Sequence, residues 1–538
     1  MSNKIFRKFT QTALAGCVLS TVSILSVNAQ ELKVALASEP TSVDPHFHNL
    51  TPNIQVTAHI FDALVKPTPA FGLEPGLAAS WKATGDKTWE FKLRPGVKFH
   101  DGSDFDAADV VYSFCRVPTV QNSPSPFTLY TRSIVAIDVV DRYTLSLTTR
   151  TAYPLLPVEL SSIGMISDGK SGAPAIAFNP AGCGAGPWPT TEEFNSGKQA
   201  IGTGPYKLVQ YVKGEQIRLE RNASYWGKAP AWDKVTLRPI SNQGARVAAL
   251  LAGDVDFIES PPIQDIPRLQ ADARLKVVQG VTSRVIYLAM DQASDKAPGV
   301  TEDIPNPFKD KRVREAISLA IDRKVIVDRV MGGLAIPANQ FLPEMMFGHN
   351  KAIPALDRNP ERAKALLAEA GLPNGFELTL STPNDRYNND ERVAQAIAQM
   401  LTRAGIKTKV QSFTSSVFFS KRNAFEFGIW LAGWGAQTGE MSSPLRALAA
   451  TVNKDLGNGV SNQGRYSNPE VDALIAQATS TVDDAARRAL LEQAMAKAMI
   501  DVGVIPLHYE VRPWAMRKGL SYTPRADEFT FAFDITRD

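Results

Sequence analysis

The residues of this chain that could do covalent chemistry are not grouped as an active site requires. A lipase-type nucleophile needs Gly-x-Ser-x-Gly and a zinc protease needs His-Glu-x-x-His, and neither pattern occurs. Of the six histidines, only His46 and His48 are spaced so that they could meet one metal ion, a spacing that loop and core histidines share. We therefore predict a protein that is not an enzyme and that has no metal site and no cofactor.

One stretch imitates a phosphate-binding loop. Residues 164–171 read Gly-Met-Ile-Ser-Asp-Gly-Lys-Ser, which fits the pattern of such loops. The chemistry needs a helix directly afterwards, whose N-terminal amides hold phosphate, but Gly172 and Pro174 follow and disfavour a helix. We predict no nucleotide site here.

The first 29 residues predict an exported protein. Three basic residues among the first eight precede the apolar stretch Ala13–Val27, and Ala29 ends a cleavage pattern. We expect residues 1–29 to be a cleaved signal peptide and the mature protein to be periplasmic. Leu14 to Cys17 resembles a lipobox, so lipidation of Cys17 stays an alternative.

The composition and net charge further limit the classes of protein to which this chain can belong. A chain of 538 residues is too long for one compact core, so two or more domains are expected. The net charge is +3, and the signal peptide carries three basic residues and no acidic ones, which leaves the mature chain neutral. A neutral chain argues against binding nucleic acid. Cys115 and Cys183 remain after cleavage, and an even pair in an oxidising compartment predicts one disulfide.

Hydrophobic periodicity predicts a mixed α/β chain. Residues 377–381 form an expected strand, Val393 to Ala404 an expected helix capped by Asn388 or Asn389, and residues 407–411 a second strand. A strand–helix–strand unit implies that the two strands pair in parallel. Other strands are expected over 31–36, 88–94, 143–149, 206–212, 216–220, 255–258, 284–290, 427–432 and 506–511. Other helices are expected over 54–64, 106–114, 246–252, 311–327, 360–370 and 483–499.

Eight blocks of sequence together carry a family resemblance. They are Glu39–Pro45, Phe61–Val65, Pro75–Trp81, Trp89–Gly102, Ala107–Ser113, Gly202–Tyr206, Asn222–Gly227 and Val313–Asp322. In order and spacing they resemble the ABC-transporter extracellular solute-binding proteins of the peptide, nickel and opine class, solute-binding protein family 5. The resemblance implies a two-lobed α/β periplasmic-binding-protein-like fold. Lobe I would comprise 30–283 plus 508–538, with a subdomain inserted at about 80–200, and lobe II would comprise 284–507.

The resemblance also implies a function. We expect the periplasmic substrate-binding component of an ABC importer, a monomer that closes its hinge on a peptide or peptide-like solute and hands it to an inner-membrane permease. A non-peptide solute, such as an opine, a metal chelate or a sugar, is the alternative. A secreted hydrolase is a less favoured one.

Three segments are implied as ligand contacts. The loop 46–53 offers His48 and Asn49, and the segment 384–389 offers Arg386, Tyr387 and Asn388. Arg386 suits a carboxylate, although an ion pair with one of the neighbouring aspartates would be a purely structural use of it.

The third segment, 433–443, offers Trp434, Gln437 and Glu440. Trp434 presents a flat face to an apolar group. Peptide binders of this family often carry an aspartate where Gln437 stands, to meet the peptide's amino group. A neutral amide cannot replace that charge. Either Glu440 compensates, or the ligand has no free amino group there.

Overall fold

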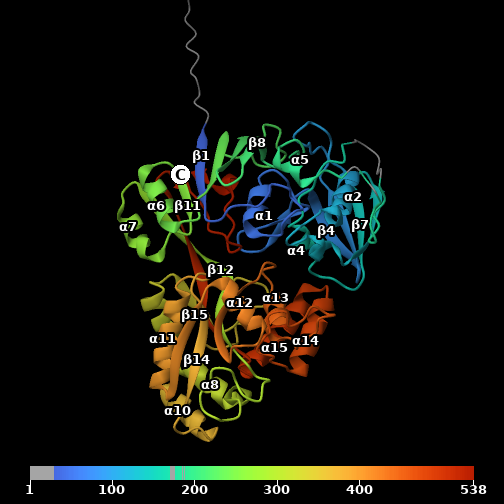
Figure 1. The fold of residues 1–538 in the computed structure, drawn as a ribbon. Helices are drawn as coiled ribbons and strands as arrows, with labels where there is room; N and C mark the ends of the chain where they lie inside the picture. Colours follow the sequence, from blue (N-terminus) through green and yellow to red (C-terminus); the bar gives the residue numbers. More distant parts are fainter. Residues whose placement is uncertain (1–29, 170–175, 185, 187) are drawn as a thin grey trace, which may run out of the picture.

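The fold consists of two lobes, one above the other in Figure 1. A computed structural model describes residues 30–169, 176–184, 186 and 188–538, so the predicted signal peptide lies outside the described residues. Lobe I, the upper body, holds the elements from β1 (Glu31–Leu36) to β11 (Phe257–Glu259) and the C-terminus. Lobe II, the lower body, holds those from α8 (Lys311–Ala320) to α15 (Asp484–Ile500). The exact division predicted at 283/284 and 507/508 stays a prediction.

Two long antiparallel strands connect the lobes. β12 (Leu275–Met290) and β17 (Val504–Arg517) pair along most of their length, and both extend from one lobe into the other. β12 is rich in β-branched residues, which favour an extended backbone. The pairing register shifts between Val281 and Val285, at the passage between the lobes.

Among the described residues, the main sheet contains eleven strands and continues from lobe to lobe through this pair. Its order is β15-β14-β16-β12-β17-β11-β1-β10-β9-β8, with β13 beside β17. The remaining members are β8 (Tyr206–Val212), β9 (Gln216–Arg221), β10 (Lys234–Pro239), β13 (Ala335–Pro337), β14 (Phe376–Pro383), β15 (Ile406–Phe413) and β16 (Ile429–Gly435).

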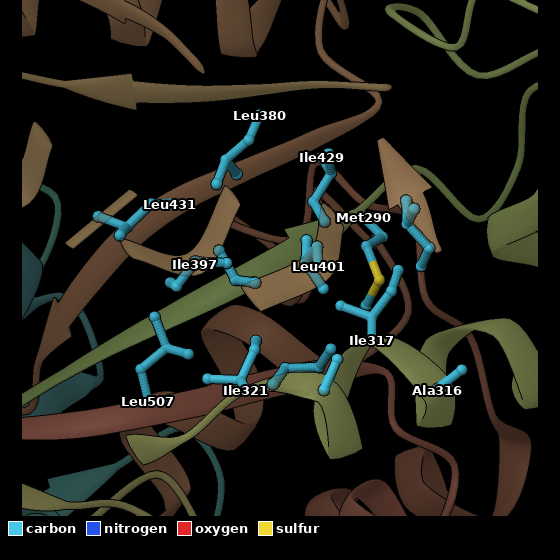
Figure 2. Packing of buried hydrophobic residues seen from close by; sticks show 14 of the residues in the cluster. Met290, Ala316, Ile317, Ile321, Leu380, Ile397, Leu401, Ile429, Leu431 and Leu507 are labelled. Atoms are coloured by element: carbon cyan, nitrogen blue, oxygen red, sulfur yellow. The ribbon is translucent and has the colours of Figure 1, made fainter. Parts of the chain in front are cut away.

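The strand–helix–strand unit of lobe II is present as predicted. β14 and β15 pair in parallel, and α11 (Asp390–Arg403) connects them. Apolar residues of α11 pack with those of α8 and of the sheet to form a buried core (Figure 2). The side chains labelled there include Met290, Ile317, Ile321, Leu380, Ile397, Leu401, Ile429, Leu431 and Leu507. Further helices of lobe II are α10 (Pro360–Glu369), α12 (Ser415–Asn423), α13 (Ser442–Pro444) and α14 (Pro469–Ser480).

Lobe I contains a second, antiparallel sheet of four strands. Its order is β4 (Ala78–Gly85), β5 (Thr88–Leu93), β7 (Thr144–Thr149) and β6 (Ile134–Asp141). Beside it lies α2 (Ala107–Arg116), which Asp106 caps in a capping box with Asp109. A disulfide joins Cys115 of α2 to Cys183, the pair that the sequence pointed to, with Cα atoms 5.6 Å apart. Lobe I also contains α1 (Thr51–Thr57), the hairpin β2 (Val65–Pro67) and β3 (Leu73–Pro75), α3 (Thr128–Thr131), α4 (Leu156–Leu160), α5 (Thr191–Asn195), α6 (Gln243–Ala252) and α7 (Ile266–Ala271).

Two predicted helices are shorter than expected. α8 ends at Ala320 because Ile321 has an extended backbone, and a new turn starts where Asp322 accepts a hydrogen bond from the Val325 amide. α1 ends at Thr57, and the carbonyl of Ile60 accepts a hydrogen bond from the Gly204 amide instead of one from within a helix.

Candidate ligand-binding cleft

Two cavities adjoin where the lobes face each other, and Gln437 lines both. The first, which we call the basic hollow, is formed mainly by lobe II, and Thr51 of lobe I also lines it. Its lining comprises Thr51, Arg284, Tyr287, Arg386, Tyr387, Phe419, Arg422, Gly433, Trp434, Gly435, Gln437 and Ser461. Three of these residues are arginines and none is acidic, so the hollow suits an anionic group.

Arg386 lies in the turn between β14 and α11, and its guanidinium forms no close ion pair in the described part of the chain. The Asp390 carboxylate accepts hydrogen bonds from the Arg386 and Tyr387 amides, both at 3.0 Å, so it holds the backbone of the turn. Burial raises the pKa of Asp390. The guanidinium of Arg386 is exposed and lies 5.3 Å from the centre of the Tyr387 ring. Among the residues that the structure describes, no carboxylate lies within ion-pair distance of it, although Glu510 and Glu528 attract its charge from farther away. The ion pair considered from the sequence is therefore not formed.

The prediction that the side chain of Asn388 or Asn389 caps α11 is wrong. Asn389 is the residue before the helix, but its backbone is left-handed and its side chain forms no capping hydrogen bond. The Asn389 side-chain amide donates to the Val330 carbonyl instead, at 2.8 Å. The Asn388 amide donates to Glu510 at 3.0 Å, which ties the turn to β17. Asn388 lies outside the basic hollow.

Arg284 is the arginine of the hollow that is already neutralised. Its Nε atom lies 3.3 Å from Glu510 and 3.4 Å from Glu528. Burial opposes its charge, but the two carboxylates outweigh burial and raise the pKa of Arg284. Arg422, by contrast, has no ion pair within the described part of the chain. It donates to the side-chain oxygen of Asn423 and stacks on Phe419 at 4.8 Å. Arg386 and Arg422 are thus the cations available to a ligand.

The aromatic wall of the hollow is held in place by hydrogen bonds. The Tyr387 hydroxyl donates to the Gly433 carbonyl at 3.2 Å, and the Trp434 indole donates to Ser443 at 3.3 Å. A methyl group at Gly433 would lie 2.8 Å from the Tyr387 ring, so only glycine lets the ring pack there. The wall can therefore stack on a ligand without rearranging.

Three further predicted contacts lie elsewhere. Glu440 is buried, pairs with Arg487 at 3.2 Å and accepts from the Ser442 hydroxyl. It is committed to the interior of lobe II and does not compensate for Gln437. His48 contacts the Thr41 hydroxyl at 2.9 Å, and Asn49 accepts from Tyr130 at 3.4 Å. Neither lines the two cavities, and Thr51 supplies the wall expected from that loop.

His46 and His48 do not converge on one point. His46 is buried with its Nε2 atom 2.8 Å from the Gly164 carbonyl, whereas His48 faces Thr41. Over residues 30–169, 176–184, 186 and 188–538, no three or more histidine, cysteine, aspartate or glutamate side chains are arranged so that they could hold a metal ion. In the same ranges, no helix has both the length and the apolar character needed to cross a bilayer. The phosphate-loop pattern ends at residues 170 and 171, outside the described residues.

The second cavity, which we call the aromatic cavity, lies in lobe I and is also lined by Gln437 and Thr438 of lobe II. Its rings are Phe61, Phe71, Tyr130, Phe529, Phe531 and Phe533. Its charged residues are Asp62, Lys66, Glu74, Glu159, Arg525, Asp527 and Asp534. Sequence reasoning missed this cavity because the C-terminal run of phenylalanines meets α1 only in three dimensions. The alternating Phe529, Phe531 and Phe533 were the available signal.

Known proteins are similar to this chain over most of its length. A family model described as bacterial extracellular solute-binding proteins, family 5, middle region, matches residues 72–455. The glutathione-binding protein GsiB of Pectobacterium atrosepticum is 28% identical over 494 residues, which cover 90% of each chain.

Solved structures show the same two-lobed architecture. HbpA2 from Haemophilus parasuis superposes with a TM-score of 0.79 at 23% identity, covering 94% of this chain and all of its own. The periplasmic binding protein DppA from Helicobacter pylori, in complex with the peptide STSA, superposes with a TM-score of 0.71 at 22% identity. That match covers 95% of this chain and 98% of DppA.

Proposed function

Since this chain belongs to family 5 of the bacterial extracellular solute-binding proteins, we propose that it captures a peptide or peptide-like solute and delivers it to an ABC importer. The solute would lie between the lobes, with its carboxylate in the basic hollow. Closure about β12 and β17 would trap it, because a closed form is favoured only by contacts made to both lobes at once. No covalent bond changes in this account.

The observation that carries the proposal is the pair of cleft arginines that form no close ion pair among the described residues. Arg386 and Arg422 line one hollow with Trp434, and Thr51 of lobe I faces them. A guanidinium binds a carboxylate through two parallel hydrogen bonds, and an aromatic face packs on the adjoining peptide unit. The glutathione-binding relative and the peptide complex of DppA support the same class of solute.

The proposal also assigns residues to each lobe and gives the protein a location and a partner. We assign lobe I to 30–283 plus 508–538, including an inserted subdomain at about 80–200, and lobe II to 284–507. The mature protein acts as a monomer in the periplasm after loss of residues 1–29, and its partner is a permease of the inner membrane. The predicted export signal supports this location.

Native mass spectrometry of freshly purified protein, followed by thermal shift with defined solutes, tests the proposal. A peptide library and glutathione should raise the melting temperature, because a ligand that binds only the folded state stabilises it. Peptides should be recovered unchanged. If opines, metal chelates or sugars raise the melting temperature and no peptide does, the peptide assignment fails. Cleavage of the bound peptide would instead indicate a hydrolase.

A further inference from the structure

One carboxylate oxygen in the aromatic cavity is buried without a partner. Glu159 is on α4 of lobe I, and its Oε1 atom accepts a hydrogen bond from the Tyr153 hydroxyl at 2.6 Å. Its Oε2 atom is buried and has no hydrogen-bond partner among the described residues. A buried carboxylate oxygen costs free energy unless a donor reaches it. Because Glu159 lines the cavity, a donor brought by a ligand can reach it.

The other charges of the cavity leave Glu159 available. Five carboxylates and two cations line it. Lys66 is paired with Asp62 at 2.7 Å, and Arg525 is paired with Asp527 at 2.7 Å and with Asp534. Both lining cations are therefore engaged. Arg446 and Arg132 act on the Glu159 charge from outside the lining, and the lining itself retains an excess of negative charge that a positively charged group would offset.

A second buried polar atom faces the same space from the opposite lobe. The Thr438 hydroxyl lines the cavity and has no hydrogen-bond partner in the part of the chain that the structure describes. Thr438 follows Gln437, the residue common to both cavities. A ligand that extends past Gln437 can therefore reach two atoms that lack a hydrogen-bond partner in the described chain. They are the Thr438 hydroxyl of lobe II and the Glu159 Oε2 atom of lobe I.

We propose that the aromatic cavity receives the amino end of the solute, with Glu159 accepting hydrogen bonds from its ammonium group and the phenylalanines packing on its first side chain. This assignment rests on the proposed function and gives the solute a direction. The carboxylate lies at Arg386 in lobe II and the ammonium at Glu159 in lobe I, so the two lobes hold opposite ends. The loss of an acidic residue at Gln437 is then offset from the other side of the cleft.

The chemistry of the cavity defines the class of solute. An ammonium donates three hydrogen bonds, and one donated to a carboxylate is charge-assisted and stronger than a neutral one. Phe531 and Phe533 are stacked with ring centroids 4.8 Å apart, which gives a flat apolar surface. We therefore expect short peptides with a free amino end and an apolar or aromatic first residue.

Binding of matched tripeptides by isothermal titration calorimetry tests the assignment. The probes are Phe-Ala-Ala, its N-acetyl form and its C-terminal amide, and the proteins are wild type, Glu159→Gln and Glu192→Gln. The glutamine keeps the acceptor for Tyr153 but removes the charge. Glu192 is an exposed residue of α5 and serves as the matched control.

We expect wild type and Glu192→Gln to bind the free peptide about tenfold or more tightly than its N-acetyl form, which is the usual value of a charge-assisted hydrogen bond. Glu159→Gln should lose that preference while keeping the preference for a free carboxylate. Equal binding of the free and acetylated peptides by wild type would overturn the assignment of Glu159 and leave the proposed function intact. Failure of wild type to bind any of the peptides and glutathione would overturn both.

Discussion

Phe71 of lobe I packs directly on Gly439 of lobe II. Phe71 is at the tip of the β2–β3 hairpin in a left-handed backbone conformation, which its turn holds through hydrogen bonds between Thr68 and Gly72 and between Phe71 and Thr68. A methyl group at Gly439 would lie 2.2 Å from the Phe71 Cβ atom. Phe71 also lines the aromatic cavity. The hairpin tip therefore links contact between the lobes to the ligand cleft.

Gly439→Ala should disfavour the closed form. Alanine would clash with Phe71 and would also strain a backbone whose φ is +63°, which costs about 1 kcal/mol. We expect peptide affinity to fall about tenfold, because part of the binding free energy would go into forcing the lobes together. Gly333→Ala is the control, since φ is +81° there with no atom within 4 Å. Calorimetry showing equal affinities for both variants would refute the role of the contact.

Arg386→Ala should weaken binding of any solute with a free carboxylate. Its guanidinium has no close ion pair in the described chain. Glu510 and Glu528, which attract its charge, keep Arg284 as their ion-pair partner, so its removal should change stability by less than about 0.5 kcal/mol. A lost charge-assisted contact should lower affinity about tenfold or more. Arg403→Ala, an exposed position on α11, is the matched control. An unchanged dissociation constant for a free peptide would show that Arg386 is not a contact.

Peptide affinity should depend on pH through Glu159. Burial raises the pKa of Glu159 to about 7, although Tyr153, Arg446 and Arg132 oppose that rise. Only the carboxylate form attracts an ammonium, so binding should weaken as pH falls through this value. Between pH 7.5 and pH 5.5 we expect a loss of about tenfold. Titrations of wild type and Glu159→Gln at both values check it, and an equally steep dependence in the variant would assign the effect to another group.

The disulfide should stabilise lobe I and leave binding alone. It spans 68 residues of chain, so cross-linking removes enough freedom from the unfolded state to contribute about 4 kcal/mol. Cys183 does not line either cavity. Urea unfolding of wild type against a Cys115→Ala/Cys183→Ala variant should show this loss, with peptide affinity unchanged. A variant that unfolds at the wild-type urea concentration would contradict the expectation.

Local signals predicted the local parts of the fold well. The start of α2 at Asp106 and the alternating strand at β5 depend on neighbours in sequence, so they could be recognised there. The parallel pairing of β14 and β15 followed from the helix between them. The break after Ala320 could not be foreseen, because an uninterrupted apolar stripe continues through Ile321.

For the candidate site, too, the residues in the predicted sequence segments could be foreseen, and those that depend on tertiary neighbours could not. Arg386, Tyr387, Trp434 and Gln437 lie in the two predicted segments, and they meet in one hollow. Glu440 could not be judged, because its partner Arg487 lies on another helix of lobe II. Arg284, Arg422 and Glu159 were missed for the same physical reason. A charged residue becomes a site residue through tertiary neighbours that compensate it or leave it free.

Small-angle X-ray scattering of the ligand-free protein, and of the same sample with a peptide that it binds, tests the central claim most directly. If two lobes close on an unaltered solute, the radius of gyration falls when the peptide is added, and it recovers when the intact peptide is dialysed away. An identical scattering curve with and without saturating peptide would contradict capture by closure.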